Sequence, residues 1–191
     1  MTDSSAILKR LKDEDIKHVD FRFTDPRGAW HHLTQSTNAV DEDLLTEGVM
    51  FDGSSIAGWK AINESDMILM PDLGTAVMDP FAAQSTLVIF CDVVEPMTGQ
   101  PYTRDPRSIS KNALNYLKST GIGDTAFIGP EAEFFVFDDV RFDVTQQASY
   151  FMLDSEEGPY NSGKVYEGGN TGHRPLPKGG YFPVGPVDSA F

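Results

Sequence analysis

The strongest constraint on the fold is a pair of short segments with strand character on either side of a tight turn. His18–Phe23 alternates polar and apolar residues with a period of two, as a half-buried strand does. Asp25–Gly28 then supplies residues that favour a turn, and residues 29–35 follow as a second arm. This pattern predicts a β-hairpin in the first part of the chain.

Two short helices are predicted around this hairpin. The apolar positions within residues 7–11 repeat as on one face of a helix, with Ser4 or Ser5 as the N-cap. A second short helix is predicted over residues 41–47, and Gly48 suits its C-terminal end. Helices mixed with strands in this order indicate the α+β class.

The next segments add strands, a loop and a break. Residues 67–70 and 86–94 are short apolar runs ended by turn residues, which favours strands. Residues 51–59 have no periodicity and contain residues that favour turns, so we expect a loop. Residues 95–101 are rich in turn residues and poor in apolar ones, which is typical of a linker.

The break divides the chain into two predicted domains, a small α+β unit over residues 1–98 and the beginning of a β-rich unit over residues 105–191. Asp105-Pro106 predicts the start of a helix, with Asp as N-cap and Pro at the first helical position. Residues 126–144 indicate two strands, and the Gly- and Pro-rich residues 155–191 have no periodicity, as in functional or mobile segments. The predicted helix would carry its apolar face on Ile109, Ala113, Leu114, Tyr116 and Leu117.

Charge and composition exclude several classes of function. The chain has 29 Asp and Glu residues against 15 Lys and Arg, a net charge of −14, which opposes binding to nucleic acid or to an anionic membrane. No apolar run approaches the roughly 20 residues of a membrane span, and the N-terminus lacks the pattern of a signal peptide. The single cysteine, Cys91, excludes an internal disulfide and fits a reducing compartment. We expect a soluble, cytoplasmic protein.

Two glutamates in an apolar setting are the sharpest candidate for chemistry. Glu131 and Glu133 lie within Gly129–Phe137, and in a strand such alternate residues share one face, with Cα atoms about 7 Å apart. Unpaired carboxylates are costly to desolvate, so a cation should face them, and Mg²⁺ or Mn²⁺ prefers carboxylate oxygen. The alternative is a solvated strand face, or pairing with Arg or Lys. These residues alone leave both interpretations open.

Other candidates each have a structural alternative. Asp52 lies in a loop that could bring its carboxylate to a ligand, but Asp-Gly-Ser also makes a plain turn. Trp59 could stack on a ligand or act as a packing anchor, and Cys91 fits a core position better than a nucleophile. The four histidines lack the spacing of a zinc site. Lys178–Tyr181 suits a loop for an anionic ligand or a plain surface loop.

Three longer motifs agree when they are taken together: Phe51–Met67, Gly129–Phe135 and Lys178–Ser189. They resemble the long N-terminal signature, the metal-binding strand and the central loop of bacterial type I glutamine synthetases. The motifs occur in the order and at the spacing of that family, and the resemblance spans essentially the whole chain.

The resemblance implies an N-terminal β-grasp domain followed by the first, β-rich part of a glutamine synthetase catalytic domain. The family makes glutamine from glutamate, ammonia and ATP through γ-glutamyl phosphate, with two or more Mg²⁺ or Mn²⁺ ions in each site. By resemblance, Glu131 binds the metal at the ATP phosphates, and Glu133 binds the metal that helps to hold and activate glutamate. Asp52 matches the aspartate that binds ammonium and promotes loss of its proton. Ser55 and Tyr181 match further members of the ammonium pocket.

The resemblance also implies a homo-oligomer, in the family a dodecamer of two hexameric rings, in which the Asp52 loop completes the active site of a neighbouring subunit. Small departures from the family pattern lie outside the reacting groups, at Ala57, Ala61, Ala132 and Gly185. The family's chain continues beyond Phe191 with further metal, glutamate and ATP ligands. We therefore expect a fragment or truncated product that does not make glutamine unaided.

Two alternatives remain beside this interpretation. One is a γ-glutamyl ligase that uses a larger amine, although Asp52, Ser55 and Tyr181 favour ammonia. The other is a non-catalytic β-grasp assembly module, which predicts no Mn²⁺ binding that depends on Glu131 and Glu133.

Overall fold

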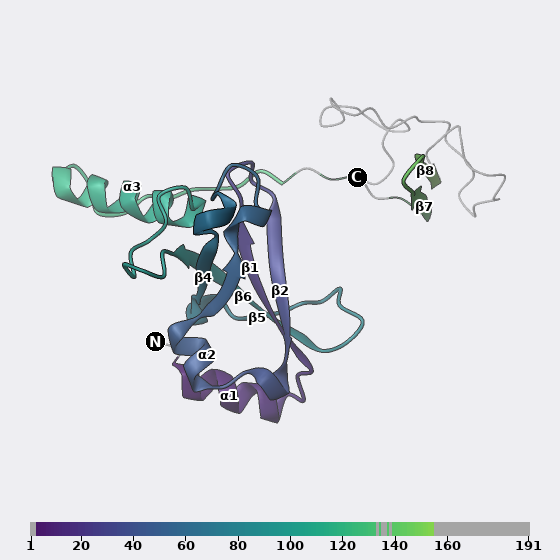
Figure 1. The fold of residues 1–191 in the computed structure, drawn as a ribbon, viewed down its shortest axis with the longest axis horizontal. Coiled ribbons are helices and arrows are strands. Elements are labelled where there is room, and N and C mark those ends of the chain that lie inside the picture. The colour runs from purple at the N-terminus through teal and green to yellow at the C-terminus, as the bar shows by residue number, and fades with distance from the viewer. Residues whose placement is uncertain (1–2, 133, 135–136, 138, 155–191) are drawn as a thin grey trace. The chain divides into compact units, whose positions relative to one another are not determined.

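The computed structural model describes residues 3–132, 134, 137 and 139–154 of the chain. Contacts divide the chain into two compact units, Met1–Phe127 and Ile128–Phe191. The first unit carries a sheet with helices, and the described part of the second carries a hairpin (Figure 1). Among the described residues, no helix is both long and apolar enough to cross a bilayer.

A six-stranded sheet forms the centre of the first unit, and its strands are β1 (His18–Thr24), β2 (Trp30–Ser36), β3 (Val49–Asp52), β4 (Asp66–Pro71), β5 (Val77–Met78) and β6 (Thr86–Val94). The strand order is β2-β1-β6-β4-β3, and β5 pairs with β6 off this path. β1 runs parallel to β6, whereas the other pairs are antiparallel. The strands predicted over residues 67–70 and 86–94 are confirmed as β4 and β6.

The predicted hairpin is confirmed as β1 and β2, which pair antiparallel with Phe23 opposite His31. Its turn is built around Asp25, whose Oδ1 accepts hydrogen bonds from the backbone N–H groups of Arg27 and Ala29 at 2.8 and 2.9 Å. Gly28 follows with φ +86°, a conformation that glycine adopts without strain. The turn chemistry of the sequence therefore fixes the hairpin register.

Helix α1 (Ser4–Asp13) is confirmed, but its predicted N-cap is wrong. The N-cap is Asp3, whose Oδ1 accepts from the N–H of Ala6 at 2.8 Å. The hydroxyl of Ser5 instead donates to the Asp3 carboxylate at 2.9 Å. A carboxylate at the N-terminus of a helix accepts from the unpaired N–H groups and also favours the helix dipole.

Helix α2 (Glu42–Glu47) is confirmed with Asp41 as its N-cap and Gly48 at its end. Gly48 has φ +89°, and a Cβ there would lie 2.5 Å from the Ile68 Cγ2 atom. The helix therefore ends at a position that only glycine fills, which places β3 directly against β4.

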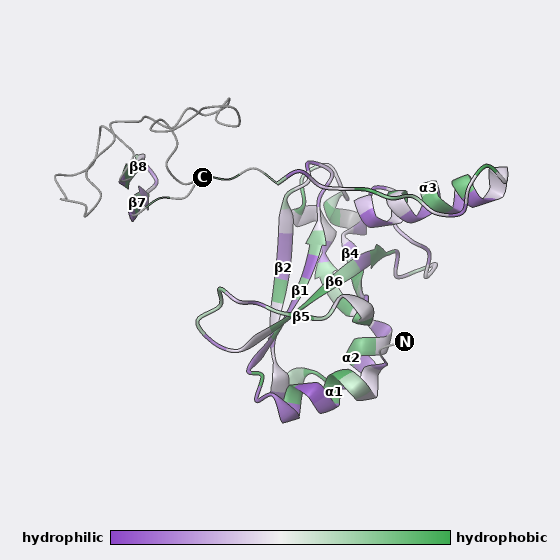
Figure 2. Ribbon diagram, turned by 180° about the vertical axis from the view of Figure 1, so that it is seen from behind, coloured by the Kyte–Doolittle hydropathy of each residue, from purple (hydrophilic) through white to green (hydrophobic). Residues whose placement is uncertain are grey.

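The core of the first unit lies between the sheet and the helices α1 and α2. Ile7 and Leu45 join it from the helices, with exposed fractions of 1 and 2 %. Figure 2 shows hydrophobic residues along β6, at the centre of the sheet. Cys91 is fully buried there, and burial raises the pKa of its thiol well above the ordinary range. This environment agrees with the prediction of a core cysteine.

Helix α3 (Pro106–Thr120) begins after Asp105 and ends at Gly121, as predicted. Figure 1 shows it extending away from the sheet. Its predicted apolar face is exposed in the described part of the chain, where the exposed fractions are 54 % for Ile109, 38 % for Leu114 and 72 % for Tyr116. The sequence pattern was right about the helix, but burial of that face requires a neighbour that the described residues do not supply.

Ion pairs fasten the beginning of α3 to the sheet. Arg107 donates to Asp92 at 2.9 Å and to Asp72 at 2.5 Å, and Lys111 also pairs with Asp92. Burial acts to raise the pKa of Asp92, but the hydrogen bonds from Lys111 and Arg107 outweigh it and hold that pKa below its ordinary value. The boundary predicted between residues 98 and 105 stays a prediction.

The described part of the second unit is a hairpin of β7 (Asp139–Val144) and β8 (Ser149–Asp154). The expectation of two strands within residues 126–144 is wrong in its first half, because the described residues 126–132 lie in no strand. A strand needs a neighbour for its backbone N–H and C=O groups, and residues 126–132 have none among the described strands. The Gly- and Pro-rich segment 155–191 lies outside the described residues.

Short 3₁₀ turns connect the elements of the first unit: η1 (Thr37–Ala39), η2 (Gly53–Ser55), η3 (Ile62–Glu64) and η4 (Leu73–Thr75).

Candidate functional site

Asp52 is the last residue of β3, at the point where the chain leaves the sheet. β3 pairs antiparallel with β4, which places Phe51 opposite Met67 and Asp52 opposite Asp66. The loop predicted over residues 51–59 therefore begins two residues later than expected, at Gly53. Phe51 and Asp52 belong to the strand because they pair with β4. We call residues 52–60 the Asp52 loop.

Gly53 determines how the chain turns after Asp52. Its backbone N–H donates to the Ser65 carbonyl at 2.7 Å. A Cβ at this position would lie 2.6 Å from the Met67 Cγ and 3.1 Å from the Ser65 carbonyl oxygen, so only glycine fits without displacement. Buried Ile56 then anchors the loop, with 7 % of its surface exposed.

The carboxylate of Asp52 is exposed but held in place by its own loop. Its Oδ1 accepts from the N–H and the hydroxyl of Ser54 at 2.8 and 2.6 Å, and its Oδ2 accepts from the Ser55 hydroxyl at 3.3 Å. The hydrogen bonds from Ser54, followed by that from Ser55, lower the pKa of Asp52. Asp52 thus makes the turn that its sequence allows and also presents an ionised carboxylate to solvent. Ser55, predicted to belong to the same pocket, contacts it directly.

Asp66 is a neighbour of Asp52 that the sequence reasoning missed. The two residues are direct partners in the β3–β4 register, and both are exposed. Like charges opposite one another destabilise a sheet unless a cation lies nearby. The signal was present in the sequence only as two acidic residues that flank a loop, and the strand register was needed to bring them together.

An aromatic cluster lies beneath the Asp52 loop. The Trp59 ring packs against Phe23 at 5.7 Å, Phe51 at 6.0 Å and Tyr102 at 5.4 Å between ring centroids. Only 6 % of Trp59 is exposed, so it acts as a packing anchor rather than a stacking platform for a ligand. Its indole N–H finds no hydrogen-bond partner within the described structure.

A hollow of about 500 Å³ adjoins Asp52. It lies between the start of β2 and the end of β3, and its lining combines aromatic, histidine and acidic side chains. The His31 ring donates an N–H to the Asp25 carboxylate at 3.0 Å, and the His32 ring donates an N–H to the Asp20 carboxylate at 2.6 Å. The hollow thus joins the ionised carboxylate of Asp52 to apolar surface.

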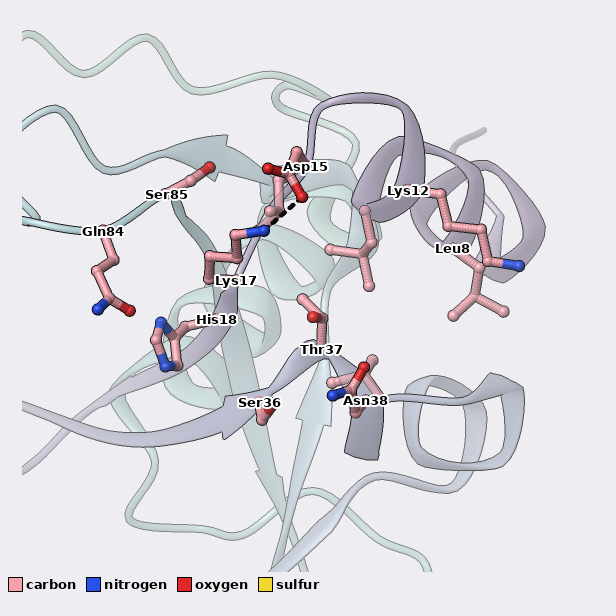
Figure 3. A pocket seen from close by; sticks show the side chains of 13 residues that line it. Leu8, Lys12, Asp15, Lys17, His18, Ser36, Thr37, Asn38, Gln84 and Ser85 are labelled. Atoms are coloured by element: carbon pink, nitrogen blue, oxygen red, sulfur yellow. Dashed lines mark hydrogen bonds and ion pairs between the residues drawn. The ribbon is translucent and has the colours of Figure 1, made fainter.

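A larger pocket of about 920 Å³ lies at the other end of the hairpin (Figure 3). Its lining includes His18 at the start of β1 and Ser36 at the end of β2. The hollow beside Asp52 lies at the opposite end of the hairpin, where β1 ends and β2 begins. Lys17 and Asp15 form an ion pair at 2.5 Å within this lining. This larger pocket is therefore separate from the candidate site.

The predicted metal ligands are described only in part. Glu131 is exposed and lies in neither helix nor strand, and it forms no ion pair with a described residue. Glu133 and Tyr181 lie outside the described residues, so their positions relative to Asp52 stay predictions. Among the residues that the structure describes, no three His, Cys, Asp or Glu side chains are grouped so that they could hold a metal ion.

Models of known families match the chain over two consecutive ranges. The model of the glutamine synthetase β-grasp domain matches residues 15–96, and that of the glutamine synthetase catalytic domain matches residues 103–191. Among curated proteins, a glutamine synthetase of Azospirillum brasilense is 64 % identical over 189 residues, which are 99 % of this chain and 40 % of the relative. A glutamine synthetase of Escherichia coli K12 is 58 % identical over 184 residues, 96 % of this chain and 39 % of the relative.

The chain thus spans about 40 % of the length of the curated relatives that it matches. A solved glutamine synthetase of Plasmodium falciparum has a TM-score of 0.67 at 22 % identity, covering 100 % of this chain and 38 % of that one, which shows likeness of fold. The predicted fold class, a β-grasp domain followed by the beginning of a glutamine synthetase catalytic domain, is confirmed. On the two family matches and the identity to its bacterial relatives, this chain belongs to the glutamine synthetase family.

Proposed function

We propose that the chain is the N-terminal part of an ATP-dependent glutamate–ammonia ligase that forms glutamine and ADP through γ-glutamyl phosphate. The observation that carries the proposal is the Asp52 carboxylate, exposed and ionised at the end of β3 within the motif that resembles the family signature. A carboxylate in this state attracts a small cation such as ammonium.

Asp52 acts in this proposal as the residue that binds ammonium and promotes loss of its proton. Hydrogen bonds from Ser54 and Ser55 fix the direction of its lone pairs, so that the carboxylate is oriented before the cation arrives. The ammonium nitrogen becomes a nucleophile only when it loses a proton, and a nearby carboxylate can accept that proton as the C–N bond forms. Ser55 and Tyr181 complete the proposed ammonium pocket.

Glu131 and Glu133 are the residues proposed to hold divalent cations, Mg²⁺ or Mn²⁺. Glu131 fits that role, since it is an exposed oxygen donor that forms no ion pair among the described residues. When bound, such ions neutralise phosphate charge and polarise the transferring group. We assign Glu131 to the ion at the ATP phosphates and Glu133 to the ion near glutamate.

The proposed assembly is a cytoplasmic homo-oligomer, with the dodecamer of two hexameric rings as the form expected for the family. The surface around Asp52 supports burial against another subunit. Trp30 and Met50 line the hollow beside Asp52 and are 63 and 60 % exposed, and Ile62, at the start of η3 just after the Asp52 loop, is 87 % exposed. Large exposed apolar side chains around a polar site are typical of an interface. The Asp52 loop would thereby complete the active site of a neighbouring subunit.

A chimera tests the proposed reaction. Residues 1–191 are joined to the remainder of the Azospirillum brasilense relative, and glutamine is measured with ATP, glutamate and ammonium. We expect ammonium-dependent formation of glutamine, and we expect Asp52→Asn to lower the rate at least tenfold at limiting ammonium because it removes the anionic charge, one such interaction being worth roughly 1.4 kcal/mol. Asp43→Asn, a charge-matched change on the surface of α2, should leave the rate unchanged.

An amine panel on the same chimera distinguishes ammonia from larger amines. Faster turnover with methylamine or ethylamine than with ammonium would contradict the ammonia assignment and support a ligase for a larger amine. The isolated 191-residue chain serves as the comparison, and sustained glutamine formation by that chain alone would overturn the expectation that it needs the remaining domain.

Calorimetric titration of Mn²⁺ into the 191-residue chain tests the metal ligands. We expect the Glu131→Gln/Glu133→Gln double variant to bind Mn²⁺ more weakly than the wild-type chain. The Asp124→Asn/Asp143→Asn variant removes the same charge at exposed positions and serves as the control. Equal Mn²⁺ affinity in the two double variants would support the non-catalytic assembly module instead.

A further inference from the structure

Residues 95–105 run from the end of the β-grasp match to the start of the catalytic-domain match, and they are fastened to the central strand β6. The backbone N–H of Tyr102 donates to the Val93 carbonyl at 2.8 Å. In return, the N–H of Val93 donates to the Asp105 carboxylate at 3.2 Å. Tyr102 is 5 % exposed and Asp105 is fully buried. This segment, which we call the junction, is therefore packed into the first unit and is not a flexible linker.

The junction also contacts the C-terminal end of the Asp52 loop, at Gly58 and Trp59. The Arg104 Nη1 donates to the Gly58 carbonyl and lies 3.4 Å from the Trp59 carbonyl oxygen. The Tyr102 ring meets the Trp59 ring edge-on, with 72° between the planes. Two backbone carbonyls and one buried ring at the end of the loop thus all contact residues of the junction.

An ion pair adds a third contact between the same two segments. The Lys60 Nζ lies 2.7 Å from the Glu95 Oε1 and 3.0 Å from its Oε2. The same ammonium group lies 5.3 Å above the centre of the Tyr102 ring, within the range of a cation–π contact. The hydrogen bond to Glu95 raises the pKa of Lys60, in agreement with a stable pair. The contact set therefore spans both ends of the junction.

From these contacts we infer that Arg104 and Tyr102 are positioning residues for Asp52, acting through the Gly58–Lys60 end of its loop. β3 fixes the loop at one end through its pairing with β4, and the junction fixes it at the other. A loop held at both ends presents its carboxylate in one orientation, which lowers the entropy cost of binding a small ligand. The role of the orientation in ammonium capture rests on the proposed function; the positioning itself does not.

The inference has a consequence for coupling between the two parts of the chain. The catalytic-domain match begins at residue 103, so Arg104 belongs to it, whereas the loop that it contacts belongs to the β-grasp match. A shift at the start of α3 would move Arg104 and with it the loop that bears Asp52. The junction thus connects the position of Asp52 to the helix that opens the next domain.

Hydrogen exchange on the 191-residue chain tests the positioning. Arg104→Ala is expected to speed exchange about tenfold in peptides that cover residues 53–60 and to leave exchange in β1 peptides unchanged. In the wild-type chain, local opening of the loop must break the charge-assisted hydrogen bond from Arg104, whereas in the variant that bond is absent and opening costs less free energy. Arg104→Lys, which keeps one cationic donor, should restore part of the protection. Arg10→Ala is the matched control, since the Arg10 Nη1 also donates to a backbone carbonyl, that of Ala76, which lies outside the loop.

A second readout follows Trp59 in a Trp30→Phe background. A red shift of its emission in Tyr102→Leu, without loss of the β1 protection, is the expected result. Unchanged exchange over residues 53–60 in Arg104→Ala, or equal acceleration over all peptides, would overturn the inference. In the chimera, Arg104→Ala should raise KM for ammonium without changing KM for ATP. An inactive wild-type chimera would refute the proposed function, while the exchange experiment would still decide the positioning.

Discussion

Replacement of Asp105 should destabilise the first unit far more than loss of an ordinary helix cap. Its carboxylate accepts from the backbone N–H groups of Val93, Ser108 and Arg107 at 3.2, 3.1 and 3.2 Å, and from the Ser108 hydroxyl at 2.7 Å. Asp105→Ala removes the N-cap of α3, worth about 1 kcal/mol. It also leaves the buried N–H of Val93 unpaired, which costs about 1–3 kcal/mol. The two losses together predict a decrease of about 3 kcal/mol in the free energy of unfolding.

Urea unfolding followed by tryptophan fluorescence measures this decrease, because Trp30 and Trp59 both lie in the first unit. Asp41→Ala is the matched control, since Asp41 caps α2 through a single hydrogen bond from the Leu44 N–H and should cost about 1 kcal/mol. Asp105→Ser keeps a capping hydroxyl but is too short to reach β6, so its cost should fall between the two. The reasoning is refuted if Asp105→Ala costs no more than Asp41→Ala.

Three further predictions concern other positions of the first unit. Gly53→Ala should lower the free energy of unfolding by about 1–3 kcal/mol, because the added Cβ would lie 2.6 Å from the Met67 Cγ in β4. At Gly123 the nearest atom to an added Cβ is 3.8 Å away, so Gly123→Ala should change the free energy of unfolding little in the same urea assay. The Cys91 thiol should react with a thiol reagent such as DTNB only at the rate of unfolding, since it is buried with a raised pKa, and rapid reaction in native buffer would contradict this. The pKa of Asp92 is lowered in the folded state, so its contribution to the free energy of unfolding is complete above the ordinary pKa of 3.8 and is lost as the pH falls through the lower folded value. Asp92→Asn should therefore reduce the loss of stability below about pH 4. The urea midpoint measured against pH checks this.

Much of the first unit could be predicted from local patterns. The alternation in His18–Phe23, the turn at Asp25–Gly28 and the capping pair Asp105-Pro106 each depend on residues close together in the sequence, and each is confirmed. The N-cap of α1 failed because three adjacent residues could all accept from the same N–H groups, and only the backbone conformation shows that Asp3 does so.

The candidate site was accessible to sequence reasoning only residue by residue. Asp52 and Ser55 were found through the motif that carries them, and the structure shows the hydrogen bond between them. Asp66 was missed, because its position opposite Asp52 follows from the register of two strands that are distant in the sequence. Glu131 was expected in a strand but lies in neither helix nor strand. A strand depends on a pairing partner from elsewhere in the chain, and the local pattern does not identify that partner.

The sequence by itself determined the family, the hairpin, the presence of the three helices with both ends of α3, and the identity of the acidic residues proposed for chemistry. Tertiary structure alone decided that the junction contacts the Asp52 loop, that Trp59 is a packing anchor and that the outer face of α3 is exposed in the described part of the chain. The physical reason is the range of the interactions. Turns and caps are formed by neighbours along the chain, whereas strand register, ion pairs and aromatic packing join residues separated by tens of positions.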